Sequence, residues 1–195
     1  AANRRFEGEA DAFPIGRGEE LRWMFTYGFR TDPQIGDWLA EDVLGAPVLP
    51  VRLTDPRYYH GDTLLCDLGG PCMAWLGGVD STSAKRLRDT FGAKMLELDD
   101  ADADAFVGNS FYVETPDERL LFASKDIPTM TRTRIEDLGV RVVPVDISEF
   151  FGKGGGGPKC MVFNLGDVDA AEDGLSNEAR RFRASRHIQA LRGQG

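Results

Sequence analysis

Apolar positions in this chain form short alternating runs separated by longer helical patterns. Three of the alternating runs resemble one another, begin at Val48, Met95 and Val142, and end in segments rich in Ser, Thr, Asp or Glu. Their starts are separated by the same interval, since 95 − 48 and 142 − 95 both equal 47. Alternation of apolar and polar residues is typical of half-buried β-strands. The pattern therefore predicts three matched strands at a fixed period.

Each of these strands is preceded by a helical pattern and, before that, by another apolar run. The helical patterns cover residues 33–43, 83–91 and 129–138, and the earlier runs cover 21–27, 72–76 and 119–123. Gly45, Gly92 and Gly139 follow the helical patterns at the position where helix C-caps favour glycine. The repeated order is strand, turn, strand, helix, strand, which indicates an α/β propeller of ββαβ units whose loops converge on an axis. The alternative is a mixed α/β domain that has this spacing by accident.

Large apolar side chains on these runs are expected in the core, which is the usual location of such stripes. They are Trp23, Phe25, Tyr27, Trp75, Leu76 and Phe122.

Composition excludes several classes of protein. The chain has 195 residues, 42% of them hydrophobic and 28% charged, as in a soluble domain of ordinary size. The net charge of −9 argues against a nucleic-acid partner and leaves room for a cationic small substrate. No apolar run is long enough to cross a membrane, and the N-terminus does not resemble a signal peptide. We therefore expect neither nucleic acid nor membrane as a partner.

Cysteine usage points to a reducing compartment, so we expect a cytoplasmic protein. There are three cysteines, an odd number, in a chain too long to need disulfide bonds for stability. Cys66 and Cys72 have neither a second cysteine pair nor a histidine cluster nearby, so we expect no zinc and no other metal site.

The segments after the three matched strands carry candidate chemistry. They read YYHGDT, FVGNS and GGGGPKC, and they place His60, Asn109 and Cys160 in the same part of each unit. The glycine run is not a phosphate-binding loop, because Lys159 is followed by cysteine rather than by Ser or Thr. It is either a flexible linker or a loop that brings the Cys160 thiol close to the axis. The short apolar run from Met161 to Leu165 predicts a strand.

Acidic residues lie on both sides of this constellation. His60 and Asp62 are two residues apart, which on an extended segment puts both on one face. In the segment FEGEADAF, alternation likewise puts Glu7, Glu9 and Asp11 on one side of a strand. Three adjacent carboxylates repel one another unless a cation sits between them, although an exposed edge would give the same pattern.

Together these motifs, FEGEADAF, YYHGDT, FVGNS and GGGGPKCM, resemble the pentein-fold guanidine-modifying enzymes from about residue 6 to residue 165. That superfamily includes amidinotransferases, dimethylarginine dimethylaminohydrolases and arginine deiminases. The resemblance implies an α/β propeller with about three of the usual five ββαβ units present in residues 1–165. Residues 166–195 form a tail expected to be helical or disordered. One departure from the motif is Gly61, where the family usually has a bulky residue.

The resemblance also implies cysteine-dependent hydrolysis or amidino transfer on arginine or a methylated arginine, through a covalent thiouronium intermediate and without a cofactor. Its expected catalytic residues are Cys160, His60 and Glu7, with Glu9 as the alternative acid. Expected to bind the substrate are Asp62, Glu9, Asp11 and Asn109. With fewer units than the family, the chain is expected to form a homo-oligomer or to require additional N-terminal units. The alternative function is a truncated pentein that binds a guanidino compound or a protein without turnover.

Overall fold

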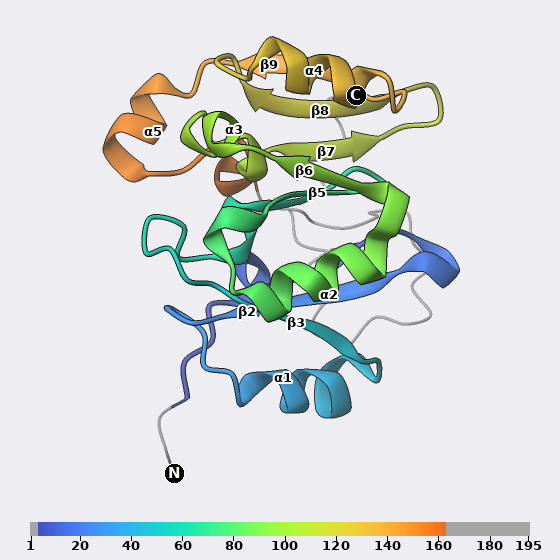
Figure 1. Ribbon diagram of the computed structural model, residues 1–195, viewed down its shortest axis with the longest axis vertical. Helices are drawn as coiled ribbons and strands as arrows, with labels where there is room; N and C mark the ends of the chain where they lie inside the picture. The colour runs from blue at the N-terminus through green and yellow to red at the C-terminus, as the bar shows by residue number, and fades with distance from the viewer. Residues whose placement is uncertain (1–3, 163–195) are drawn as a thin grey trace, which may run out of the picture. The chain divides into compact units, whose positions relative to one another are not determined.

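The computed structural model describes residues 4–162, and these residues form three sheets of three strands each. In every sheet an antiparallel pair of strands is followed by a helix and by a third strand parallel to the second. The predicted ββαβ unit is therefore confirmed and occurs three times. Figure 1 shows the units in chain order along the long axis, with β1–β3 at the bottom and β7–β9 at the top.

The strands and helices have the following bounds. The first unit contains β1 (Ala12–Ile15), β2 (Arg22–Tyr27), α1 (Ile35–Trp38), the π-helical segment η3 (Leu39–Leu44) and β3 (Val48–Arg52). The second contains β4 (Leu65–Asp67), β5 (Cys72–Trp75), α2 (Ser81–Phe91) and β6 (Met95–Leu98). The third contains α3 (Asp100–Asp104), β7 (Phe111–Glu114), β8 (Arg119–Ser124), α4 (Thr129–Glu136), β9 (Arg141–Val145) and α5 (Ser148–Gly154).

Short 3₁₀ turns connect these elements. They are η1 (Gly8–Ala10), η2 (Gly18–Glu20), η4 (Gly61–Thr63), η5 (Leu76–Gly78), η6 (Gly92–Lys94), η7 (Val107–Asn109) and η8 (Lys159–Met161).

The period read from the sequence is confirmed. Strands β3 and β6 begin at the expected residues, and β9 begins one residue earlier than expected. Gly45, Gly92 and Gly139 each have a positive φ, at +59°, +50° and +77°. L-residues rarely adopt this backbone conformation, so glycine ends each helix at the same point of the repeat.

The first helix differs from a regular α-helix. It is α-helical only over Ile35–Trp38 and continues as the π-helical segment η3. The wider turns let Leu39 and Leu44, five residues apart, both pack on the small apolar cluster around Phe25.

Successive units are joined at the outer edge of each third strand. The backbone N–H of Arg52 in β3 donates to Ser83 Oγ of α2 at 2.9 Å, and Arg86 donates to the carbonyl of Pro50 at 2.5 Å. Arg134 of α4 donates similarly to the carbonyl of Glu97 in β6 at 3.1 Å. The helix of one unit therefore satisfies backbone groups at the strand edge of the unit before it.

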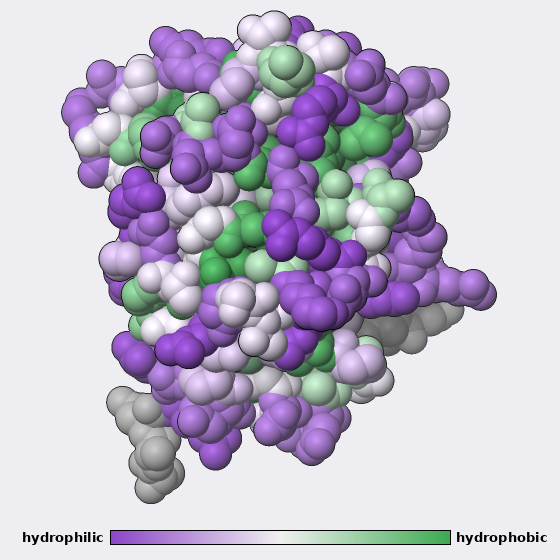
Figure 2. Space-filling view, in the orientation of Figure 1, coloured by the Kyte–Doolittle hydropathy of each residue, from purple (hydrophilic) through white to green (hydrophobic). Residues whose placement is uncertain are grey.

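One large apolar core runs through all three units, and a small cluster lies under α1. The expected core aromatics are only partly confirmed: Phe25 and Trp75 are buried, whereas Trp23, Tyr27, Leu76 and Phe122 are half-buried. Hydrophilic residues cover most of the face shown in Figure 2, and hydrophobic residues appear there in separate small patches. Within residues 4–162, no helix is both long and apolar enough to cross a membrane.

The strand expected after Cys160 does not begin at Met161. That residue belongs to the 3₁₀ turn η8, because the N–H of Met161 donates back to the carbonyl of Pro158. Residues 163–165 and the expected tail 166–195 lie outside the described residues.

Candidate active site

The three loops that follow the third strands meet at one place through the side chain of Asn109. Its Nδ2 donates to the carbonyl of Asp62 at 2.7 Å, and its Oδ1 accepts from the N–H of Gly157 at 2.7 Å. Asn109 is completely buried. The loops carrying His60, Asn109 and Cys160 are therefore brought together, as the repeat predicted, with Asn109 as the link between the other two.

Glycine is required where these loops touch. A Cβ atom on Gly108 would lie 2.6 Å from the Cα of Leu64, and one on Gly157 would lie 2.9 Å from Asn109 Oδ1. Real Cβ atoms do not approach other atoms this closely, so only glycine fits at these two positions. Gly157 is moreover buried and hydrogen-bonded, so the end of the glycine run is a packed part of the fold rather than a free linker.

His60 and Glu7 form a close pair. The Nε2 atom of His60 lies 2.6 Å from Oε2 of Glu7, and the His60 side chain is only 18% exposed. The other oxygen of Glu7 lies 3.5 Å from Nη1 of Arg30. The hydrogen bond with His60, assisted by the charge of Arg30, lowers the pKa of Glu7. An ionised Glu7 can therefore accept a hydrogen bond from the imidazole and orient the ring.

The acidic segment is not the extended strand that alternation predicted. Gly8 has a φ of +69°, and residues Gly8–Ala10 form the turn η1. As a result the three carboxylates point to different partners: Glu7 to His60, Glu9 to the ammonium of Lys159, and Asp11 into the protein. Mutual repulsion is avoided because each carboxylate has its own donors.

Asp11 is buried and satisfied. Its Oδ1 accepts from Thr26 Oγ1 at 2.5 Å and from the N–H of Gly61 at 3.0 Å, and its Oδ2 accepts from Thr31 Oγ1 at 2.7 Å. The residue is 1% exposed. Asp11, like Asn109, was expected to bind substrate, yet both side chains are enclosed and hydrogen-bonded to the protein, and Asp11 anchors the loop that follows His60.

The unusual glycine of the HGD motif is explained by this anchor. A Cβ on Gly61 would lie 2.3 Å from Oγ1 and 2.4 Å from Cγ2 of Thr26. Thr26 thus occupies the space behind the loop while donating to Asp11. A bulkier residue at position 61 would displace one of these partners.

Asp62 is buried, and its side chain lacks a hydrogen-bond donor at one oxygen. It is 7% exposed, and within the described part of the chain its Oδ1 has no hydrogen-bond partner. Burial raises the pKa of Asp62 to about 6, while the charges of His60 and Lys159 oppose the rise. Burying a carboxylate oxygen without a donor is costly unless a cation fills the position. The geometry is therefore suited to a cationic ligand.

Cys160 is the exposed cysteine, whereas Cys66 and Cys72 are buried. Partial shielding of the thiol, together with the negative charge of Asp62, raises the pKa of Cys160. The neighbouring polar groups of Asn109 and Gly157 and the charge of Lys159 oppose this rise in the pKa of Cys160. The thiol therefore needs additional positive charge nearby to become a thiolate at neutral pH.

Three neighbours of the site were not identified from the sequence. Arg30 contacts Glu7 and lies 5.0 Å from the ring of Tyr59, which packs edge-on against His60 at 4.8 Å. Lys159 pairs with Glu9. Tyr59 and Lys159 had a signal in the sequence, because they stand next to His60 and Cys160, whereas Arg30 had none.

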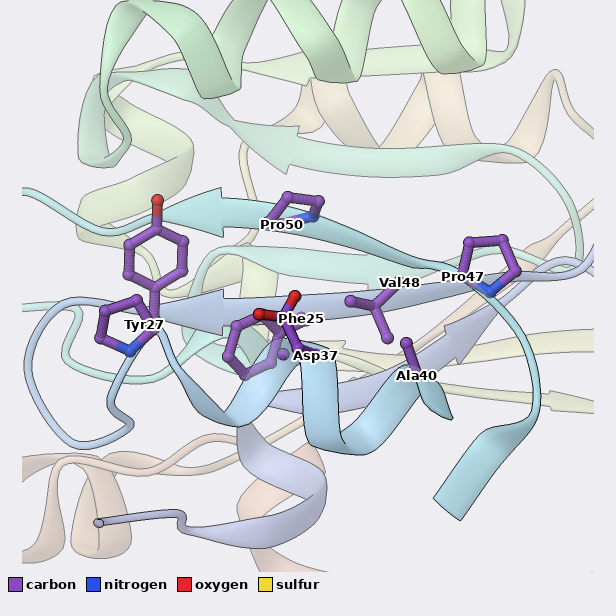
Figure 3. Close-up of a pocket in the computed structure, with 9 residues that line it drawn as sticks. Phe25, Tyr27, Asp37, Ala40, Pro47, Val48 and Pro50 are labelled. Atoms are coloured by element: carbon purple, nitrogen blue, oxygen red, sulfur yellow. The ribbon is translucent and has the colours of Figure 1, made fainter. Parts of the chain in front are cut away.

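A separate cavity of about 330 Å³ lies between α1 and strands β2 and β3 (Figure 3). It is lined by Phe25, Tyr27, Pro33, Gly36, Asp37, Ala40, Pro47, Val48 and Pro50. None of the expected site residues borders this cavity. Across residues 4–162, no three His, Cys, Asp or Glu side chains gather in a way that could hold a metal ion.

Comparisons with known proteins gave related sequences and related folds, although no family model matches the chain. The chain is 32% identical over 163 residues to N(G),N(G)-dimethylarginine dimethylaminohydrolase of Mycobacterium tuberculosis, covering 82% of this chain and 49% of that protein. It is 28% identical over 192 residues to the bifunctional arginine dihydrolase/ornithine cyclodeaminase AgrE of Nostoc, covering 94% of this chain and 25% of that protein. The chain thus spans about half the length of the first relative and a quarter of the second.

The fold is shared with the N-terminal domain of ArgZ, an arginine dihydrolase of cyanobacteria. Its product-bound structure has a TM-score of 0.75 at 26% identity, covering 85% of this chain and 58% of that one. A structure of the same domain covalently bound to a reaction intermediate has a TM-score of 0.73 at 25% identity, covering 83% of this chain and 57% of that one.

Proposed function

Because the chain is related by sequence and by fold to the pentein guanidine-modifying enzymes, we propose that it carries the cysteine-dependent chemistry of a guanidino-group hydrolase. The observation that carries the proposal is the buried carboxylate of Asp62, whose Oδ1 has no partner among the described residues and whose pKa responds to the charges of His60 and Lys159. Asn109 joins its loop to the loop of Cys160. A guanidinium is a planar cation whose N–H groups suit such a carboxylate. Arginine or a methylated arginine is the proposed substrate.

The proposed reaction has two steps. The Cys160 thiolate attacks the guanidinium carbon, a C–S bond forms, and the C–N bond to the leaving amine breaks as His60 supplies a proton to that nitrogen. Water, deprotonated by His60, then attacks the thiouronium carbon, and the C–S bond breaks to release a ureido product and the thiolate. Glu7 keeps His60 oriented throughout. We favour water over an amine as the second nucleophile because the named relatives are hydrolases.

Substrate charge has a defined part in this scheme. A guanidinium held by Asp62 offsets the negative charge that raises the pKa of Cys160. The same cation favours ionised Asp62 over its protonated form. Binding of the correct cation therefore shifts Cys160 further toward the reactive thiolate.

Apart from Glu9, which pairs with Lys159, the predicted site residues divide into two groups in this proposal. Cys160, His60, Glu7 and Asp62 act on the substrate. Asp11 and Asn109 hold the loops in position, because their polar atoms are bonded within the protein.

We further propose that additional ββαβ units complete the enzyme, from a longer chain or from a second copy. The support is the repeated edge contact, in which α2 satisfies β3 and α4 donates to β6. Pro50 is the residue of β3 whose carbonyl accepts from Arg86. Pro144 holds the equivalent position in β9, and Pro144 is exposed. The relatives are also about two to four times as long, given the coverage of 49% and 25%. Light scattering of the isolated chain is expected to show association.

A cytoplasmic location remains part of the proposal. All three cysteines are free. Reduced thiols persist in reducing compartments, and the proposed nucleophile must be a reduced cysteine.

The test combines turnover with covalent labelling. Cys160→Ser is expected to abolish hydrolysis of the guanidino substrate while leaving the thermal unfolding midpoint unchanged. A haloacetamidine should label wild-type protein once, at Cys160, and His60→Ala should lose this label. Cys66→Ala serves as the matched control and should keep the label. Binding of arginine without turnover or labelling would instead support the non-catalytic alternative, and turnover by Cys160→Ser would exclude the covalent route.

A further inference from the structure

The ion pair between Lys159 and Glu9 joins two segments that are 150 residues apart in the chain. Lys159 precedes Cys160 in η8, and Glu9 lies in η1, two residues after Glu7. The Lys159 side chain is only 18% exposed, and its Nζ lies 6.0 Å from the centre of the Phe111 ring. A lysine that is enclosed to this degree, with a carboxylate and an aromatic ring as partners, has a defined position rather than a free surface rotamer.

The charges around the thiol come from different elements. Asp62 of η4 brings negative charge to Cys160, and Lys159 from the same turn as the thiol brings positive charge. Glu9 of η1 faces Lys159 from the other side. The charge of Lys159 also opposes the effect of burial on Asp62. Lys159, which lies in the same turn as Cys160, is therefore a cation whose charge opposes that of Asp62 at the thiol.

The ion pair with Lys159 also bears on the expected role of Glu9 in substrate binding. A carboxylate expected to bind the guanidinium is already engaged by an ammonium of the same protein. A second cation would have to displace Lys159 to reach it. The buried Oδ1 of Asp62 has no such competitor within residues 4–162.

Building on the proposed function, we propose that Lys159 is a positioning residue whose charge, held in place by Glu9, stabilises the Cys160 thiolate before substrate arrives. Glu9 in this arrangement orients the lysine and is not a substrate ligand. The competing explanation is mechanical: the ion pair ties the Cys160 loop to η1, and the sign of the charge beside the thiol is irrelevant.

The experiment measures the rate of Cys160 alkylation by neutral iodoacetamide across pH, with the modified residue identified by mass spectrometry. Lys159→Met is expected to slow alkylation at pH 7 about fivefold, the order expected for one unit charge near a protein surface. In Lys159→Met the pH at which the alkylation rate is half of its maximum should rise. Lys159→Arg keeps the charge, so its alkylation rate is expected to stay near that of the wild type. The rate of Glu9→Gln should lie between those of the wild type and Lys159→Met. An unchanged midpoint in Lys159→Met would overturn the proposal.

Exchanging Glu9 and Lys159 distinguishes the effect of the charge beside the thiol from the effect of the ion pair that holds the loop. The double variant Glu9→Lys with Lys159→Glu retains an ion pair but puts the negative group next to the thiol. We expect alkylation at least as slow as in Lys159→Met. Wild-type reactivity in the exchanged protein would show that only the tether matters. Thermal unfolding of each variant identifies those that fail to fold, in which case the difference between Glu9→Gln and the wild type carries the test.

The two proposals fail differently. Alkylation by iodoacetamide needs neither a guanidino substrate nor turnover, so it tests Lys159 on its own. Turnover by Cys160→Ser would remove the proposed function, whereas a flat response of alkylation to Lys159 variants would remove only the role of Lys159.

Discussion

The surroundings of Asp11 and of Asp62 differ more than their burial does. The two carboxylates are 1% and 7% exposed, and Asp62 belongs to the loop that begins at His60, whose Gly61 donates to Asp11. Asp11 accepts hydrogen bonds from Thr26, Thr31 and Gly61. Asp62 has one oxygen without any partner among the described residues, and burial raises its pKa to about 6. The number of hydrogen-bond donors around the carboxylate, and not its exposed fraction, distinguishes a group that supports the fold from one suited to bind a ligand.

The comparison also shows how a site can be held open at a cost to stability. Asp11 provides fixed acceptors that bring β2 and the His60 loop together. Asp62 is placed by its backbone, since its carbonyl accepts from Asn109, while its side chain keeps free lone pairs. Such an unsatisfied group destabilises the protein alone and is compensated when a cation binds.

The largest expected effect is on stability, from removing Asp11. Asp11→Ala would leave two hydroxyls and a backbone N–H buried without their acceptor. We expect the free energy of unfolding to fall by about 3–5 kcal/mol, as when one partner of a buried charged network is lost. Denaturant unfolding measures this, and Asp62→Ala is the matched control. An equal loss in both variants would abolish the distinction between the two carboxylates.

Asp62→Asn should weaken ligand binding and leave stability intact, the opposite of what is expected for Asp11→Ala. A hydrogen bond to a buried charge contributes about 1.5–3 kcal/mol, so binding of arginine should weaken roughly ten- to a hundredfold. The free energy of unfolding should not decrease, because the amide carries no buried charge. Calorimetric titration of arginine in the Cys160→Ser background measures the binding. Unchanged affinity would mean that the ligand does not use Asp62.

The smallest effect concerns pH. The pKa of Asp62 in the folded protein, about 6, is above its ordinary value of 3.8. The folded state therefore binds more protons between these values, and the stability this gives is present below about pH 4 and lost as pH rises through 6. The difference between the two pKa values sets an upper limit of about 3 kcal/mol, and we expect a change of about 1–2 kcal/mol.

Unfolding of the wild type and of Asp62→Asn at pH 4 and at pH 7 measures that difference. The wild type should lose stability relative to the variant on going from pH 4 to pH 7. Parallel pH dependence in the two proteins would assign Asp62 an ordinary solvated environment.

The fold could be read from the sequence because its signals are local. Strand alternation, helix spacing and a glycine at each helix end depend on neighbours within one turn or one strand, so the repeat of 47 residues was visible without coordinates. The shared position of His60, Asn109 and Cys160 in the repeat followed from the same logic, since equivalent loops of repeated units converge.

What each side chain does at the site was decided by the tertiary structure. Sequence alternation put Glu7, Glu9 and Asp11 together, whereas the turn at Gly8 separates them and partners 53, 150 and 50 residues away select their directions. The tight contact of Gly61 with Thr26 likewise joins residues from different strands and loops. Hydrogen-bond satisfaction is a property of the assembled surroundings, so no local pattern could tell that Asp11 is saturated and that Asp62 is not.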